Sequence, residues 1–264
     1  MTVDERERVR EFYERQAQQN PRHAAVLGEP NDFARAYREY QELKVFRSLL
    51  SSPPPARFVE FGSGGGRWLE AMAPVAKQCI GVEFSGRCVE VSRARLERFA
   101  NVVVHQSAIQ DFRLESQVDL LYFSGVLLYL PDEELLPCLR AHLEHLSSGG
   151  HVMIRDTVAL GETHQWRHPQ DYVATYRSID DWQRMMTALG LRLDSRAVAN
   201  ERPISDRVKR SWPLRAMYQL ARRCGTDRSM LTWVSNTFGH AATKIVQEAE
   251  YSHDFLLFHV GCES

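Results

Sequence analysis

The sequence predicts an α/β fold: a doubly wound, mostly parallel sheet of seven strands, with N-terminal helices and a helical insertion before the last strand. Two observations support this prediction. Short apolar runs alternate with amphipathic segments between residues 57 and 155, at the spacing of βαβ units. The first run ends in the glycine-rich stretch 62–66 (GSGGG), and a helical pattern follows. Strand, glycine-rich turn and helix together open a nucleotide-binding unit.

The elements are expected in the following order. Residues 2–18 form a charged, solvated helix, and residues 32–50 form an amphipathic helix capped by Asp32. Apolar runs predict strands at 57–61, 78–82, 101–105, 118–123 and 151–155. Helices are expected after the first strand and at 86–99, 132–146 and 179–189. Strands at 190–198 and 254–260 complete the core.

Acidic residues stand at the ends of the first two strands. Glu60 precedes Gly62 by two residues, where a carboxylate suits a cationic ammonium group and would repel a pyrophosphate. Glu83 ends the second strand, where an acid can accept both hydroxyls of a ribose. Arg67 occupies the position at which a dinucleotide fingerprint has its third small residue. These residues favour an adenosyl ligand with an amino-acid tail.

Stretches 60–66 (EFGSGGG) and 82–85 (VEFS) resemble the first two motifs of the class I S-adenosylmethionine (SAM)-dependent methyltransferases. The resemblance covers about residues 55–198 and the last strand, and it implies SAM as the cofactor. Ser107 stands where this family usually has an aspartate against the adenine, so a backbone contact from Ala108 or Ile109 is the alternative. The cofactor contacts that the resemblance implies are Glu60, Gly62, Ser63, Gly64, Glu83, Phe84, Ser107, Ala108, Ile109, Ser124, Gly125 and Tyr37.

The resemblance also divides the chain into four parts. Residues 1–52 are N-terminal helices that cover the cofactor site, where aromatic side chains often contact the cofactor in this family. Tyr13 and Tyr37 are therefore candidates, with solvent exposure and core packing as their respective alternatives. The other parts are the SAM-binding core (53–198), a helical insertion that is either a lid or a dimer surface (199–250), and the last strand (251–264).

Substrate chemistry is expected near the polar stretch 155–177, which follows the fifth strand. His164 or His168 suits proton transfer near neutral pH, with Asp156 next. A solvated loop whose histidines have no role is the alternative. The two histidines lack a partner acid for a metal site, so no metal is expected. Further histidines on the helix 132–146, such as His142, are read as surface residues. Substrate contacts are expected from Tyr129, Arg155, Tyr172, Tyr176 and Arg177.

The insertion is strongly basic. Between Glu201 and Leu231, eight arginines and lysines oppose three acids, a local charge of +5. This bias predicts a clamp for an anionic substrate group, to which Arg207, Arg210 and Arg215 would contribute. A solvated charged face or a dimer surface is the alternative.

Composition restricts the function classes. A net charge of −1 gives no electrostatic case for nucleic acid. The apolar stretches are too short to span a membrane, and five cysteines without a C-x-x-C pair favour a reduced, cytoplasmic protein. We therefore expect a methyltransferase that acts on an oxygen or nitrogen of a small-molecule or carrier-linked metabolite. An anionic metabolite is expected if the basic insertion is a clamp, and a homodimer is expected if the insertion is a dimer surface. The alternatives are an RNA or protein methyltransferase, or a SAM-binding protein of this fold without transfer activity.

Overall fold

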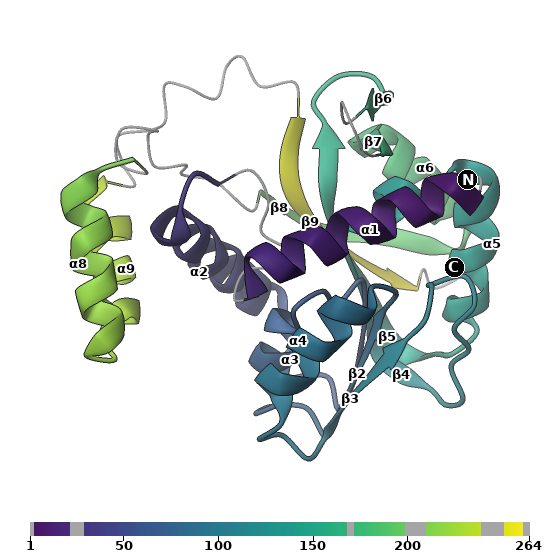
Figure 1. The fold of residues 1–264 in the computed structure, drawn as a ribbon. Helices are drawn as coiled ribbons and strands as arrows, with labels where there is room; N and C mark the ends of the chain where they lie inside the picture. The colour runs from purple at the N-terminus through teal and green to yellow at the C-terminus, as the bar shows by residue number, and fades with distance from the viewer. Residues whose placement is uncertain (1–2, 22–28, 168–171, 199–209, 239–250, 261–264) are drawn as a thin grey trace.

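A nine-stranded sheet organises the fold in the computed structural model, which describes residues 3–21, 29–167, 172–198, 210–238 and 251–260 (Figure 1). The sheet runs β3-β2-β1-β4-β5-β7-β6, while β9 pairs with β5 and β8 pairs with β9. The strands are β1 (Arg57–Phe61), β2 (Gln78–Glu83), β3 (Val102–Gln106), β4 (Val118–Ser124), β5 (Leu146–Ala159), β6 (His164–Arg167), β7 (Val173–Ser178), β8 (Leu191–Val198) and β9 (Tyr251–Val260).

The pairing confirms the predicted mostly parallel sheet. Strands β3, β2, β1, β4 and β5 are parallel neighbours, and their carboxyl ends therefore meet along one edge. Strand β9 lies antiparallel to both β5 and β8. The antiparallel hairpin β6–β7 adds two strands to the seven predicted, in a stretch predicted only to be polar.

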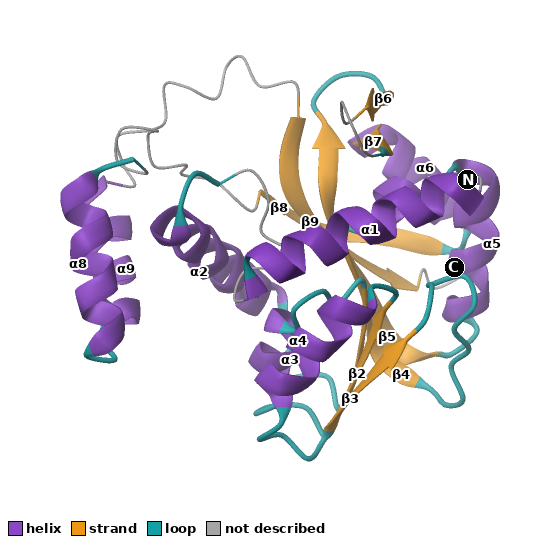
Figure 2. Ribbon diagram, viewed as in Figure 1, coloured by secondary structure: helices purple, strands orange, loops and turns teal. Residues whose placement is uncertain are grey.

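Helices cover both faces of the sheet, as a doubly wound fold requires (Figure 2). Asn31, and not Asp32, caps α2: the Asn31 side chain accepts a hydrogen bond from the Ala34 amide at 3.1 Å. The helices are α1 (Val3–Gln19), α2 (Asp32–Leu49), α3 (Arg67–Met72), α4 (Gly86–Leu96), the short 3₁₀ turn η2 (Leu127–Tyr129), α5 (Asp132–Leu143), α6 (Ile179–Ala188), α8 (Trp212–Arg223) and α9 (Asp227–Phe238).

Two apolar clusters fill the space between the sheet and its helices. One joins β1, β4 and β5 to α5 and α6, and the other joins the opposite face to α2, α3 and α4. His142 belongs to the first face and is 2% exposed, so its prediction as a surface residue is wrong. Its ring lies 4.3 Å from that of Phe61, and its Nε2 lies 3.0 Å from the Ile109 carbonyl oxygen.

The described part of the insertion is the helical hairpin α8–α9, which packs against α2 at one side of the molecule (Figure 1). Tyr37 and Phe33 of α2 meet Leu214, Tyr218 and Val234 of the hairpin in one buried cluster. Tyr37 is 3% exposed there. The apolar side of the α8–α9 hairpin therefore covers the apolar face of α2.

Candidate functional site

A cavity opens where the parallel strands end, between that edge of the sheet and α1. Its walls come from the last residues of β2 and β4, from the loops that follow β1, β2, β3 and β4, from Arg155 within β5, and from the helices α1 and α3. The lining residues are Arg6, Val9, Tyr13, Gly62, Ser63, Gly64, Arg67, Trp68, Val82, Glu83, Phe84, Ser107, Ala108, Ile109, Gln110, Ser124, Gly125, Val126, Tyr129, Leu130 and Arg155. Ten of the twelve residues expected to contact a cofactor line this cavity; Glu60 and Tyr37 do not.

The glycine-rich loop forms part of one wall, and its backbone adopts a conformation that is rare for residues with a side chain. Gly62 and Gly64 have φ angles of 73° and 51°. A Cβ atom on Gly62 would also lie 3.0 Å from the Cβ of Val126, so the loop has no room for a side chain at this position. Gly62, Ser63 and Gly64 of this loop line the cavity.

Glu83 ties this loop to the next helix. Its Oε2 accepts a hydrogen bond from the Gly64 amide at 2.8 Å, and its Oε1 accepts one from the Ser85 amide at 2.9 Å. Burial raises the pKa of Glu83, while these amide donors oppose the rise. Each carboxylate oxygen can accept a second hydrogen bond, so Glu83 retains capacity for a ligand hydroxyl.

Glu60 lies behind the glycine loop and does not line the cavity. Its side chain is fully buried, and burial raises its pKa well above the usual range. The nearby charge of Arg67 opposes this rise.

Helix α1 supplies the wall opposite the sheet, contrary to its prediction as a solvated helix. The hydroxyl oxygens of Tyr13 on α1 and Tyr129 on η2 lie 2.7 Å apart. Burial raises the pKa of both tyrosines, so both hydroxyls are neutral at physiological pH. The Tyr172 ring lies 5.2 Å from that of Tyr129 and 5.0 Å from that of Phe12. The pair thus sits in an aromatic surround.

The candidate bases after β5 lie elsewhere. His164 is exposed on β6, where its ring meets that of Tyr176 at 5.7 Å, and it does not line the cavity. His168 lies outside the described residues. Asp156 is 1% exposed, accepts a hydrogen bond from the Thr157 amide at 2.9 Å, and also lies outside the cavity wall. Burial raises the pKa of Asp156 to about 7.

The five expected substrate residues separate into three groups. Tyr129 and Arg155 line the cavity. Tyr172 and Tyr176 are buried beside Tyr129 in the aromatic cluster. Arg177 is 1% exposed and holds the turn between β4 and α5. It donates to Asp132 at 2.7 and 2.9 Å and to the carbonyl oxygens of Leu127 at 3.1 Å and Leu130 at 2.5 Å.

The expected clamp on the insertion has no counterpart in this wall. Arg210 and Arg215 do not line the cavity, and Arg207 lies outside the described residues. Sequence reasoning missed Arg6 and Val9 on α1, and it treated Arg67 as a departure from a motif. The apolar stripe Val9, Phe12 and Tyr13 on α1 was a signal for the missing wall.

Neither a metal cluster nor a membrane span is present in the part of the chain that the structure describes. No three histidine, cysteine or acidic side chains lie close enough there to hold a metal ion. None of its helices is long and apolar enough to cross a membrane.

Comparison with known proteins identifies the family. Residues 33–196 match the model of a family described as a methyltransferase domain. Phosphoethanolamine N-methyltransferase 1 of Zea mays is 22% identical over 204 residues, which cover 73% of this chain and 40% of that protein. Nodulation protein S of Sinorhizobium fredii is 22% identical over 139 residues, which cover 51% of this chain and 62% of that protein. The chain thus spans less than two thirds of the length of these curated relatives.

Solved structures share the fold at low identity. Phosphoethanolamine N-methyltransferase 1 of Haemonchus contortus, in complex with phosphoethanolamine and S-adenosylhomocysteine, superposes with a TM-score of 0.64 at 15% identity and covers 100% of this chain and 51% of that one. An S-adenosylmethionine-dependent methyltransferase of Mesorhizobium loti gives a TM-score of 0.58 at 14% identity, covering 83% and 97%. The match over residues 33–196, together with this sheet and its glycine loop, shows that the chain belongs to the methyltransferase domain family of SAM-dependent, class I Rossmann-like enzymes.

Proposed function

We propose that the protein transfers the methyl group of SAM to an amine nitrogen of a small molecule. The observation that carries the choice of nitrogen is the neutral Tyr13–Tyr129 pair, 2.7 Å apart, in a cavity wall without a histidine, lysine or aspartate among the described residues. A neutral amine already carries its nucleophilic lone pair, whereas a hydroxyl group gains from a base that removes its proton.

The cavity fits an adenosyl cofactor with an amino-acid tail. Gly62 and Gly64 line the cavity and carry no side chain, so a ligand can approach their backbone. Glu83 keeps acceptor capacity for ribose hydroxyls, and the backbone of Ala108 and Ile109 lies in the same wall for an adenine ring. When bound, SAM supplies an electrophilic methyl group on a positively charged sulfur.

The tyrosine pair would orient the nucleophile. Each hydroxyl can donate one hydrogen bond and accept others. A hydroxyl oxygen of the pair can therefore accept a hydrogen bond from the N–H group of an amine, which orients the lone pair of the amine nitrogen. The rings of Tyr13 and Tyr129 line the cavity, where an aromatic face can stabilise the cationic product by cation–π attraction. Alignment of nucleophile and methyl group is the main contribution expected of this protein.

The names of two relatives agree with nitrogen as the acceptor, since both are phosphoethanolamine N-methyltransferases. Their substrate is not carried over, because the chain covers 40% and 51% of those proteins. An oxygen acceptor is the second candidate. His164 lies on the β6–β7 hairpin next to the aromatic cluster and would have to move to reach a substrate hydroxyl.

The test is a panel of paired acceptors. Each primary or secondary amine is assayed beside the alcohol of the same carbon skeleton, with methyl-labelled SAM, and product formation is measured as a mass increase of one methylene. We expect label in amines, with a rate that rises as the pH approaches the amine pKa. Transfer to alcohols alone, lost in His164→Ala, would favour the oxygen candidate instead.

A further inference from the structure

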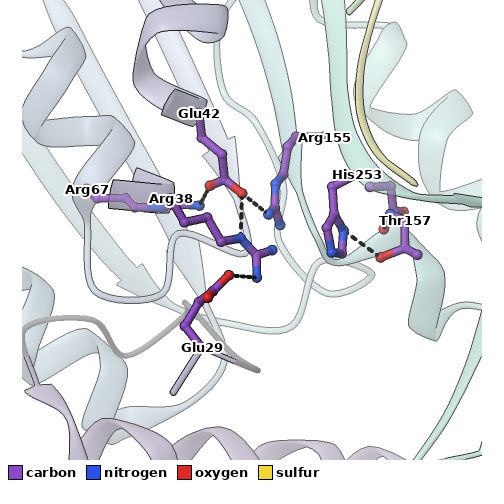
Figure 3. Close-up of polar contacts among 8 residues, drawn as sticks. Glu29, Arg38, Glu42, Arg67, Arg155, Thr157 and His253 are labelled. Atoms are coloured by element: carbon purple, nitrogen blue, oxygen red, sulfur yellow. Dashed lines mark hydrogen bonds and ion pairs between the residues drawn. The ribbon is translucent and has the colours of Figure 1, made fainter. Parts of the chain in front are cut away.

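A buried cluster of charged side chains joins helix α2 to the core of the protein (Figure 3). Glu42 of α2 is fully buried, and three arginines from three elements converge on its carboxylate. Arg155 of β5 and Arg67 of α3 each place Nη2 at 2.5 Å from a Glu42 oxygen. Arg38, one turn earlier on α2, places Nε at 3.0 Å. Glu42 on helix α2 therefore holds two side chains of the core, Arg67 and Arg155, by charge attraction.

The positive charge of this cluster exceeds its negative charge on the cavity side. Glu29 approaches Arg38 at 4.0 Å, which provides Arg38 with a second carboxylate. Arg67 and Arg155 are left to share Glu42. The other acid beside Arg67 is Glu60, and burial raises the pKa of Glu60 well above its usual range. A buried pair of guanidinium groups with one carboxylate between them attracts a further anion.

Arg67 and Arg155 are also the two members of the cluster that line the cavity, and each residue is 9% exposed. Among the described residues, Nη1 of Arg67 and Nε of Arg155 are buried and have no hydrogen-bond partner. Nη1 of Arg155 lies 3.4 Å from the position that a Cβ atom on Gly125 would take, at the turn that ends β4. Buried donors without partners are uncommon, and they mark places where a ligand or water completes the site.

We propose that Arg67 and Arg155 form a carboxylate-binding subsite of the cofactor cavity, and that Glu42 is a positioning residue that holds both guanidinium groups toward it. The ligand group is the α-carboxylate of the amino-acid tail of SAM, so the proposal rests on the cofactor and not on the identity of the methyl acceptor. Guanidinium groups match carboxylates with two parallel hydrogen bonds. Arg67 directly follows the glycine loop, which places the subsite at the loop end of the cavity.

Arg155, which was predicted to contact the substrate, would therefore contact the cofactor instead. An anionic group on the substrate would present the same chemistry to this arginine pair, and a ligand series separates the two sources. S-adenosylhomocysteine and its decarboxylated analogue, S-adenosyl-3-thiopropylamine, differ only in the carboxylate. Their dissociation constants are measured by calorimetry on the full chain and on the variants Arg67→Gln, Arg155→Gln and Arg38→Gln.

The wild-type protein is expected to bind S-adenosylhomocysteine at least about tenfold more tightly than the analogue, as two charge-assisted hydrogen bonds imply. Arg67→Gln and Arg155→Gln should each weaken S-adenosylhomocysteine binding by about 10- to 100-fold and leave the analogue unchanged. Arg38→Gln is the matched control, because Arg38 also pairs with Glu42 but does not line the cavity. In Arg38→Gln, the ratio of the two dissociation constants should equal that of the wild type.

Glu42→Gln tests the positioning role, and Glu42→Asp is the conservative rescue. In Glu42→Gln, S-adenosylhomocysteine should lose its affinity advantage over the decarboxylated analogue, while binding of the analogue is unchanged. Glu42→Asp should restore part of this advantage. If Glu42→Gln does not fold, the two cavity arginines still decide the proposal. Equal losses for both ligands, or no loss for either in Arg67→Gln and Arg155→Gln, would overturn the subsite. A raised KM for an anionic amine with unchanged S-adenosylhomocysteine affinity would assign the pair to the substrate instead. Methyl transfer to amines is scored separately, so the two proposals can fail independently.

Discussion

The hydroxyl groups of Tyr13 and Tyr129 lie 2.7 Å apart, although 116 residues separate them in the sequence. The contact joins α1, which precedes the core, to the turn after β4. It therefore places an N-terminal side chain on the cavity and closes the wall opposite the sheet.

Removing either hydroxyl should impair transfer more than cofactor binding. Tyr13→Phe and Tyr129→Phe keep the rings but lose the hydrogen bond that would orient the amine, so we expect kcat to fall by about 10- to 100-fold. The affinity for S-adenosylhomocysteine should stay within about twofold, since the aromatic packing is retained. Tyr40→Phe is the control, because the Tyr40 hydroxyl contacts Thr232 at 3.0 Å and does not line the cavity. Wild-type kcat in both cavity variants would contradict the proposed role.

Glu83 should determine cofactor affinity through two kinds of contact. Glu83→Gln replaces one acceptor oxygen with a donor, which opposes the Gly64 or Ser85 amide and weakens the expected contact to the ribose. We expect S-adenosylhomocysteine binding to weaken by about 1–3 kcal/mol, measured by calorimetry. Glu90→Gln, which removes an exposed partner of Arg87 on α4, should bind as the wild type does. Unchanged affinity in Glu83→Gln would show that Glu83 only shapes the loop.

The sequence was sufficient for the fold because the parallel strands are short apolar runs bounded by turns. Strands β1, β2 and β4 are buried on both faces, and such runs stand out from their surroundings. The hairpin β6–β7 has no such signal, since β6 reads HQWR and three of its four residues are exposed. Its pairing is decided by contacts with the rest of the protein, as with Tyr176 against Tyr251.

The part of the site that lies at the strand ends could be predicted from the sequence, and the part that lies on the N-terminal helices could not. Residues at strand ends, such as Glu83 and Ser124, could be placed because parallel strands bring their carboxyl ends to one edge. The contributions of α1 and α2 could not be placed, because packing sets where a helix lies and its sequence gives only which face is apolar. Tyr13 lines the cavity and Tyr37 packs against the α8–α9 hairpin, although both tyrosines lie on N-terminal helices.

Arg177 is predicted to stabilise the fold rather than bind substrate. Arg177→Met would leave the buried carbonyl oxygens of Leu127 and Leu130 without this donor, and Asp132 without its partner. We expect the free energy of unfolding in urea to fall by about 2–4 kcal/mol. Arg184→Met, which removes an exposed partner of Asp181, should change it by less than about 0.5 kcal/mol. A variant with wild-type stability and a raised KM would return Arg177 to the substrate site.

His142 should make the protein less stable in mild acid. Burial is the main cause that lowers its pKa from 6.5 to about 4. Between these values the unfolded chain binds a proton that the folded protein does not, so the free energy of unfolding decreases as the pH falls. The decrease should reach at most about 3 kcal/mol near pH 4 and be absent above pH 7.

The measurement compares urea unfolding of the wild type and His142→Gln at about pH 7 and pH 4.5. Gln cannot titrate and keeps an N–H donor for the Ile109 carbonyl, so the variant should lose less stability than the wild type between the two pH values. Other groups titrate in this range, and subtracting the two proteins removes their contribution where the sites are independent. His151→Gln, on a residue that is only partly buried, is the matched control and should follow the wild type. An identical pH dependence in wild type and His142→Gln would show that this histidine does not titrate with a lowered pKa.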